Sequence, residues 1–327
     1  MKCPRISAIV PTHNRASSLR HTIASLQQQS LPSDDYEIIV VDNASTDDTK
    51  TVVEEANRKG AKEVRYVYEG RLGLHNARHA GARAAQARIL AFTDDDAICE
   101  RDWLEQLLAC YSDPQVGCAG GKILPKWEVP PPTWILRYPG ALALLDRGDE
   151  VKELKWPEDI YGCNFSIRRE VLFGLGGFNP ESFSDIWLGD GETGLVRKVY
   201  AAGWKVIYNP KAVVWHIIPQ SRLTLEYMKR RFANQGAADS YSAYQSKHPT
   251  PVFLGFRSIV FLFLACGFQI ISLLLKGIHS EIYYVSALRA VYCLSRSRYE
   301  FKLIFDKQLR ALAACRDWIN ESTESMM

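Results

Sequence analysis

The chain has 327 residues, enough to bury a sizeable core in one large domain or in a domain with an appendage of about 100 residues. Hydrophobic residues make up 47% and charged residues 24%, which excludes a largely disordered chain and a multi-span membrane protein. The net charge of +3 is too small to indicate a nucleic-acid partner. The eight cysteines include no C-x-x-C pair, which argues against structural zinc.

The first 120 residues alternate short β-branched runs with helical patterns. We expect strands at residues 6–10, 37–41, 64–68 and 89–92, and helices at 17–29, 47–59 and 74–86. This alternation is typical of βαβ units. The predicted fold class is therefore α/β, with a parallel sheet covered by helices on both faces.

Polar residues directly follow three of the predicted strands, at 12–15, 42–43 and 94–96. In open α/β sheets, ligands bind beyond the carboxyl ends of the strands. We therefore expect these three segments to meet at one pocket.

Prolines and tryptophans interrupt the pattern between residues 125 and 157, where we predict a long loop or lid. Regular structure is expected again at 161–167, 193–202, 205–208 and 212–215. We expect the catalytic domain to span residues 1–219 and a helical extension to span residues 220–327.

The extension contains an almost continuous apolar segment, residues 252–275, close to the roughly 20 residues that cross a bilayer. It is compatible with a spanning helix, a helix in the membrane interface, or a buried hairpin helix. We favour membrane contact, and an interfacial position over a span. A basic amphipathic helix that anionic lipid would attract is expected next, carrying Arg289, Arg296, Arg298 and Lys302.

The chain begins without the apolar region of a signal peptide. The main domain is thus expected in the cytoplasm, and the protein at the cytoplasmic face of the cell membrane, peripheral or single-span.

Three consecutive carboxylates, Asp94 to Asp96, follow a strand at the ligand-binding edge. Such oxygen ligands suit Mg²⁺ or Mn²⁺, which bind one or two carboxylates together with diphosphate oxygens. If this tripeptide is extended, Asp94 and Asp96 point one way and Asp95 points away. An acidic turn that caps the following helix is the alternative. Asp42 could accept hydrogen bonds from a base or a ribose.

Seven segments occur in a recognisable order: PTHNR, VVDNASTDDT, GLHNARHAGA, FTDDDA, GCNFSIRRE, GDGETGL and VVWH. Over residues 6–216 this order resembles the family 2 glycosyltransferases of the GT-A fold. The resemblance implies a Rossmann-like, mixed but mainly parallel sheet flanked by helices, and an inverting hexosyltransferase of bacterial polysaccharide or glycolipid synthesis.

The resemblance also implies a donor site for a nucleotide diphosphate sugar, with a UDP-sugar as the default. Its residues would be Pro11, Thr12, Arg15, Asp42, Arg78, Asp94 and Asp95. Asp96 and His216 would bind the divalent cation, Mn²⁺ or Mg²⁺, although a lone histidine is more often structural. His79 stands where the family commonly has asparagine.

Glu192 takes the place of the family's usual catalytic aspartate and is the predicted base. Asp190 is the reserve candidate, or else the N-cap of a helix. Asn164 would contact the donor sugar or the acceptor.

The implied reaction is a metal-assisted single displacement onto a glycan or lipid-linked acceptor at a membrane surface. A nucleotidyltransferase and a non-catalytic sugar-nucleotide binding module are the alternatives. A hydride-transferring enzyme is disfavoured because no G-x-G-x-x-G follows the first strand.

Overall fold

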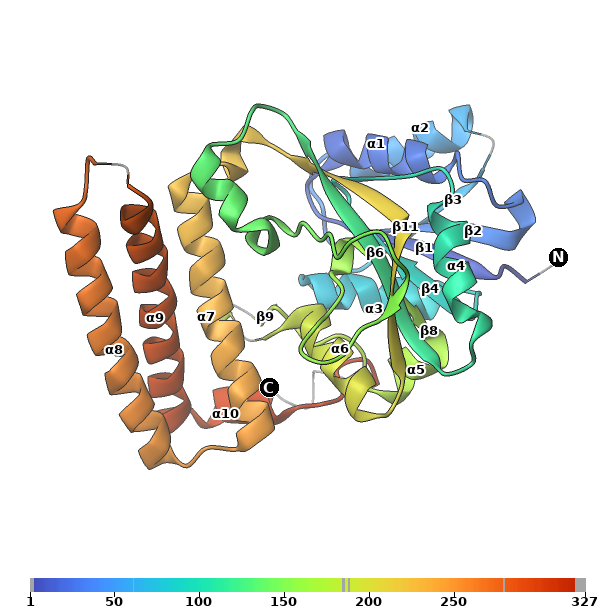
Figure 1. The fold of residues 1–327 in the computed structure, drawn as a ribbon. Helices are drawn as coiled ribbons and strands as arrows, with labels where there is room; N and C mark the ends of the chain where they lie inside the picture. Colours follow the sequence, from blue (N-terminus) through green and yellow to red (C-terminus); the bar gives the residue numbers. More distant parts are fainter. Residues whose placement is uncertain (1–2, 61, 184–185, 188, 279, 321–327) are drawn as a thin grey trace.

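The computed structural model describes residues 3–60, 62–183, 186–187, 189–278 and 280–320. Within them, nine strands form one mixed sheet, in the order β3-β2-β1-β4-β8-β6-β11-β5, with β7 paired to β11 (Figure 1). The strands are β1 (Ile6–Thr12), β2 (Tyr36–Asp42), β3 (Val64–Tyr68), β4 (Ile89–Phe92), β5 (Ala97–Cys99), β6 (Val116–Trp127), β7 (Lys152–Glu153), β8 (Phe165–Arg168) and β11 (Lys205–Ile218). A separate hairpin joins β9 (Ser182–Phe183) to β10 (Ile186–Trp187).

The first four sheet strands, β1 to β4, pair in parallel, as the sequence predicts. β1 is buried along its whole length, because helices cover both faces of the sheet. One face packs on α1 (Ala16–Leu26), α2 (Thr49–Lys59) and α4 (Trp103–Ala109). The other packs on α3 (Leu74–Ala84), α5 (Arg169–Gly174) and α6 (Gly191–Ala201). β8 runs antiparallel between β4 and β6 and makes the sheet mixed.

Two expectations about the middle of the chain are wrong. The segments 205–208 and 212–215 are one strand, β11, whose register with β6 shifts between Asn209 and Val214. Pro210 lies in that shift, and a proline cannot donate to a sheet ladder. Residues 125–157 are not one irregular loop either. They begin as the end of β6 and continue through η3 (Thr133–Arg137), η4 (Pro139–Leu142) and β7.

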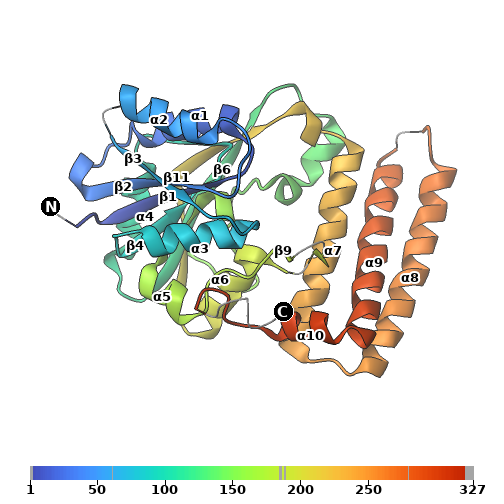
Figure 2. The same ribbon diagram turned by 180° about the vertical axis from the view of Figure 1, so that it is seen from behind.

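The helical extension consists of α7 (Leu225–Lys247), α8 (Pro251–Leu274), α9 (Glu281–Phe305) and α10 (Lys307–Ala314). α7 lies beside the catalytic unit, α9 packs on α7, and α8 packs on the outer side of α9 (Figures 1 and 2). The chain then returns to the catalytic unit, where the Trp318 amide donates to the Gly176 carbonyl. Ile319 joins the core below α3 and α6, so the extension is fastened at both ends.

α8 is long and apolar enough to cross a membrane by length and composition. Four residues form its buried stripe: Leu254, Ser258, Ala265 and Ser272. Two polar contacts hold it on α9: Arg257 pairs with Glu300 at 2.6 Å, and the Ser258 hydroxyl donates to the Ser297 carbonyl. One polar side chain, Gln269, is exposed on α8. The exposed large hydrophobic side chains of α8 are Val252, Phe253, Phe256, Ile259, Val260, Leu262, Phe263, Leu264, Ile270, Ile271, Leu273 and Leu274.

Candidate active site

A cavity of about 1070 Å³ opens at the carboxyl ends of β1 and β4. The turn after β4 forms its floor, and α3, α6 and α7 contribute walls. Of the predicted site residues, it brings together Pro11, Thr12, Arg15, Arg78, Asp94, Asp95, Asp96, Glu192 and His216. Residues as far apart in sequence as Pro11 and His216 thus share one pocket, as the convergence of strand ends predicts.

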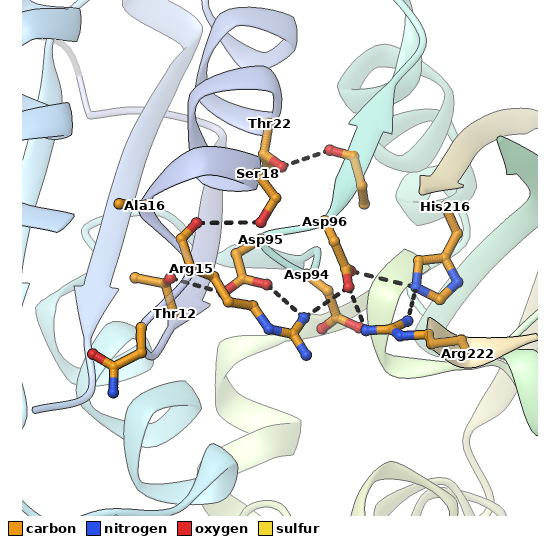
Figure 3. Close-up of polar contacts among 12 residues, drawn as sticks. Thr12, Arg15, Ala16, Ser18, Thr22, Asp94, Asp95, Asp96, His216 and Arg222 are labelled. Atoms are coloured by element: carbon orange, nitrogen blue, oxygen red, sulfur yellow. Dashed lines mark hydrogen bonds and ion pairs between the residues drawn. The ribbon is translucent and has the colours of Figure 1, made fainter. Parts of the chain in front are cut away.

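Asp94 to Asp96 form a turn, closed by a hydrogen bond from the Ala97 amide to the Asp94 carbonyl. The expected alternation of an extended chain is therefore wrong. Asp95 accepts hydrogen bonds from the Thr12 hydroxyl at 2.7 Å and from Arg15 at 3.1 Å. Asp96 accepts from the same Arg15 nitrogen at 2.7 Å, so one guanidinium joins both carboxylates (Figure 3).

Arg15 contacts Asp96 from one side, and Arg222 and His216 contact it from the other (Figure 3). Arg222 donates to Asp96 at 2.6 Å and to His216 Nε2 at 2.8 Å. His216 Nδ1 lies 3.0 Å from the Leu142 carbonyl, which can only accept, so Nδ1 carries the proton and Nε2 keeps its lone pair. Sequence reasoning missed Arg222. Its position six residues after His216 is the one signal that could have indicated it.

Burial disfavours the charged form of all three aspartates, but their neighbours differ. Burial raises the pKa of Asp95 to about 6, against the opposing effect of Arg15. It also raises the pKa of Asp94. For Asp96, the guanidinium groups of Arg222 and Arg15 outweigh burial and hold the pKa below its usual range. Asp96 is thus the aspartate that is most firmly ionised.

The donor set around Asp96 fits a hard divalent cation. No cluster of three or more His, Cys, Asp or Glu ligands exists among the described residues, so a closed protein cage is absent from that part. The Asp96 carboxylate and the unprotonated His216 Nε2 lie 3.4 Å apart. Mg²⁺ and Mn²⁺ are commonly held by one or two protein ligands while a substrate diphosphate supplies the rest. Two donors therefore suffice for such an ion.

A buried arginine, Arg78 of α3, links the aspartates to the predicted base. One guanidinium nitrogen lies 3.2 Å from Glu192, and the other lies 3.6 Å from Asp94. The Gly162 amide donates to Glu192 at 3.0 Å. A side chain at Gly162 would collide with Arg78, since a Cβ there would lie 2.2 Å from its nitrogen. Burial opposes ionisation of Glu192, but Arg78 and the Gly162 amide hold its pKa below the usual value.

Glu181 is the second glutamate that lines the cavity, and sequence reasoning missed it because it belongs to none of the recognised segments. Burial, together with the charge of Glu192, raises the pKa of Glu181 to about 7. Gly191 provides the space for it, because a Cβ at Gly191 would lie 3.2 Å from the Glu181 carboxylate. The cavity therefore holds two glutamates with opposite pKa shifts.

Asp190, the reserve candidate for the base, does not line the cavity. It occupies the N-cap position of α6, where its buried carboxylate binds Arg197, Asn179 and Ser242. Ser242 belongs to α7. Asp190 therefore fastens the catalytic unit to the extension.

Asn164 is also absent from the cavity wall. It is fully buried, and its side-chain amide is hydrogen-bonded within the protein. It accepts from the Trp103 indole and donates to the carbonyls of Lys122 and Ala212. Asp42 likewise lies outside the cavity lining. Its carboxylate accepts from the Tyr66 hydroxyl and the Ser45 amide.

Comparison with known proteins identifies the family. A sequence model described as Glycosyl transferase family 2 matches residues 7–174. The validoxylamine A glucosyltransferase of Streptomyces hygroscopicus subsp. jinggangensis is 34% identical over 125 residues, which are 36% of this chain and 29% of that relative. The glucosyl-dolichyl phosphate glucuronosyltransferase of Haloferax volcanii is 26% identical over 71% of this chain and 75% of that relative.

Solved structures share the fold. A mannosyltransferase from Pyrobaculum calidifontis, in complex with GDP-Man and Mn²⁺, superposes with a TM-score of 0.59 at 20% identity, covering 93% of this chain and 88% of that chain. S. aureus TarS in complex with UDP gives a TM-score of 0.51 at 15% identity, covering 90% and 91% of the two chains. The sheet and its flanking helices are thus of the GT-A type.

Proposed function

This chain belongs to glycosyltransferase family 2, and from that premise we propose that it transfers a sugar from a nucleotide diphosphate sugar to an acceptor hydroxyl with inversion. The observation that carries the proposal is the contact of buried Arg78 with both Asp94 and Glu192. It puts the residues proposed for the donor and for the base in one cavity. Family membership disfavours the nucleotidyltransferase alternative.

In the proposed mechanism, Glu192 accepts the proton of the acceptor hydroxyl as its oxygen attacks the anomeric carbon. The bond from that carbon to the diphosphate breaks in the same step, and the diphosphate leaves with the electron pair. Pro11, Thr12, Arg15 and Asp94 would line the nucleotide side. Arg78 keeps Glu192 ionised, so the carboxylate is ready to accept the proton.

Asp96 and His216 would hold a divalent cation, which supplies Lewis-acid stabilisation of the leaving diphosphate. The ionised state of Asp96 and the unprotonated Nε2 of His216, which Arg222 would release to the cation, support this role. A structural neighbour was solved with GDP-Man and Mn²⁺, and another with UDP, so donors of both nucleotides are candidates. Arg15 and Arg222 would compensate the charges around the diphosphate.

We further propose that α8 lies in the interface of a membrane, on its cytoplasmic face, rather than across it. Arg257 of α8 pairs with Glu300 of α9, and a spanning α8 would either lose that contact or carry the charged pair into the bilayer, where charge is costly. The acceptor would be a glycan or a lipid-linked sugar. A relative whose name specifies a dolichyl phosphate substrate supports the lipid-linked type.

The decisive experiment is donor binding by calorimetry, with UDP-glucose, UDP-N-acetylglucosamine and GDP-mannose tested in Mn²⁺ and then in chelator. We expect one donor to bind in Mn²⁺. Chelator removes the cation and Asp96→Ala removes one of its ligands, so each should weaken donor binding by about tenfold or more. Asp34→Ala, an exposed aspartate far from the cavity lining, is the matched control. Folded protein that binds none of these donors would contradict the proposed function.

A further inference from the structure

His79 is a buried histidine that lies beside the cavity rather than in its wall. It follows Arg78 on α3, is 1% exposed and does not line the cavity. Its Nε2 accepts a hydrogen bond from the backbone amide of Phe178 at 2.9 Å. Because an amide N–H can only donate, Nε2 is unprotonated and the ring proton lies on Nδ1. Burial holds the pKa of His79 well below its ordinary value, so the ring stays neutral and keeps this acceptor.

The Phe178 amide follows a turn that favours glycine. Gly176 and Gly177, directly before it, both have φ angles in the left-handed region, +75° and +73°. A Cβ at Gly177 would also lie 2.5 Å from His79 Nε2, so a side chain there would displace the imidazole. The two glycines thus allow the Phe178 amide and the imidazole to meet.

The ring of Phe178 in turn packs on the guanidinium of Arg78. The guanidinium carbon lies 5.1 Å from the ring centre, within the range of a cation–π contact. Phe92 and Phe165 also pack on this fully buried ring, at 5.1 and 5.5 Å between ring centres. Within the described residues, the Nε of Arg78 has no hydrogen-bond partner. The position of the guanidinium therefore depends on the Phe178 ring as well as on its ion pairs.

The ionisation of Glu192 depends on where Arg78 lies. Burial disfavours the charged form of Glu192, but the Arg78 guanidinium, 3.2 Å away, and the Gly162 amide lower its pKa. The titratable groups that face Glu192 from other segments all become negative when they ionise: Glu181, Asp94, Asp159, Tyr161 and Cys163. None of these groups can replace the guanidinium. Displacement of Arg78 would therefore raise the pKa of the proposed base.

We propose, on the basis of the glycosyltransferase function proposed above, that His79 is a positioning residue for the transfer reaction: it fixes Phe178, whose ring holds Arg78 against Glu192. The imidazole acts through these neighbours, since it does not reach the cavity. A neutral ring suits this role, because a protonated one could not accept from the amide and would repel Arg78.

The test measures the pKa of Glu192 in the full chain in detergent, by ¹³C NMR of labelled glutamate carboxyl groups. His79→Phe keeps an aromatic ring but removes the acceptor, and we expect it to raise the pKa of Glu192 by about one pH unit or more. His79→Gln should restore the wild-type titration, because its side-chain oxygen can accept from the same amide. Glu192→Gln assigns the signal, which should be absent from its spectrum.

His75→Phe is the matched control. His75 is a buried histidine of the same helix that does not line the cavity. Its replacement should change the melting temperature and leave the titration of Glu192 in place.

Phe178→Leu supplies a second measurement that does not depend on the folding of His79→Phe. It keeps the backbone amide and removes the aromatic ring, so the pKa of Glu192 should rise here too. If the wild-type protein transfers a sugar, the acidic limb of the pH profile of kcat should move to higher pH in both variants. The pH profile is a readout that a purely structural role of His79 would not move.

Folded His79→Phe in which Glu192 titrates as in the wild type would overturn the proposal. So would a His79→Gln variant that behaves like His79→Phe, or an equal shift in His75→Phe. The NMR titration needs no donor, acceptor or cation, and it therefore separates two failures. Sugar transfer without the expected shifts overturns this inference alone, whereas the expected shifts in a protein that transfers no sugar overturn the proposed function.

Discussion

Arg78 connects the two chemical halves of the cavity, and its contact with Glu192 makes the base testable. Glu192→Gln keeps the shape of the side chain but removes its ability to accept a proton. We expect transfer to fall by about 10²–10⁴-fold, the usual contribution of a general base, while donor affinity stays near that of the wild type. Single-turnover kinetics with the bound donor would measure the loss.

Asp190→Asn is the useful comparison for this variant. Asp190 lies outside the cavity in contact with Arg197, so its substitution should lower stability and leave measurable transfer. Full turnover by Glu192→Gln would end the base assignment.

Glu181 gives a pH dependence of stability with a definite sign. Its pKa is raised in the folded protein to about 7, so the folded state holds the proton more tightly than the unfolded state. The stability that it contributes is present at low pH and is lost as the pH rises through 7. Glu181→Gln should therefore raise the melting temperature, relative to wild type, more at pH 8 than at pH 5.

Thermal melts of both proteins at the two pH values would measure this difference. Glu54→Gln is the control, because Glu54 is an exposed glutamate of α2 that does not line the cavity. An identical difference at pH 5 and pH 8 would show that Glu181 does not titrate in that range.

At the residue scale, the recognised segments predicted the residues that follow β1 and β4, because the chemistry there is local to the strand ends. Glu181, Arg222 and Arg231 could not be predicted. They lie between or beyond those segments, and only folding brings them to the cavity. For Asn164 the reason is the opposite. It belongs to a recognised segment and was predicted to contact a sugar, but its amide donates to the backbone carbonyls of Lys122 and Ala212.

At the scale of elements, α8 combines a narrow buried stripe with an apolar exposed face. Phe256 and Phe263 are 63% and 74% exposed, and burial of each in lipid would contribute about 1.5–3 kcal/mol. We expect Phe256→Ser with Phe263→Ser to lower binding to anionic phospholipid vesicles by more than about tenfold in a flotation assay. Leu136→Ser, at an exposed leucine of η3, is the matched control.

The same assay distinguishes an interfacial helix from a spanning one. An alkaline carbonate wash should release the wild-type protein from vesicles, since α8 stays packed on α9 through Arg257 and Glu300. Retention after the wash would contradict the interfacial position.

The elements themselves were predictable to unequal degrees. The boundaries of β1 to β4 lie within two residues of those expected, because continuous β-branched runs define buried parallel strands. The shift in β11 and the continuation of β6 past residue 125 escaped prediction. Both depend on pairing between strands that are distant in sequence, which no local pattern contains.

At the scale of the whole molecule, the sequence predicted a GT-A fold followed by helices, and the family membership confirms that fold. It did not predict how the parts join. Asp190 binds Ser242 of α7, and Trp318 and Ile319 return to the catalytic unit after α10. Such contacts join residues that are distant in sequence, and no local hydrophobic pattern indicates which of them will meet.

The return of Ile319 to the core has a consequence for biosynthesis. Synthesis on the ribosome proceeds from the N-terminus, and N-terminal domains generally fold first. Here the core that contains residues of α3 and α6 is completed by Ile319. This residue emerges from the ribosome only after α8 has left the exit tunnel. The enzyme would thus complete its core only after α8 has been synthesised, so that folding of the core and docking of the extension are coupled.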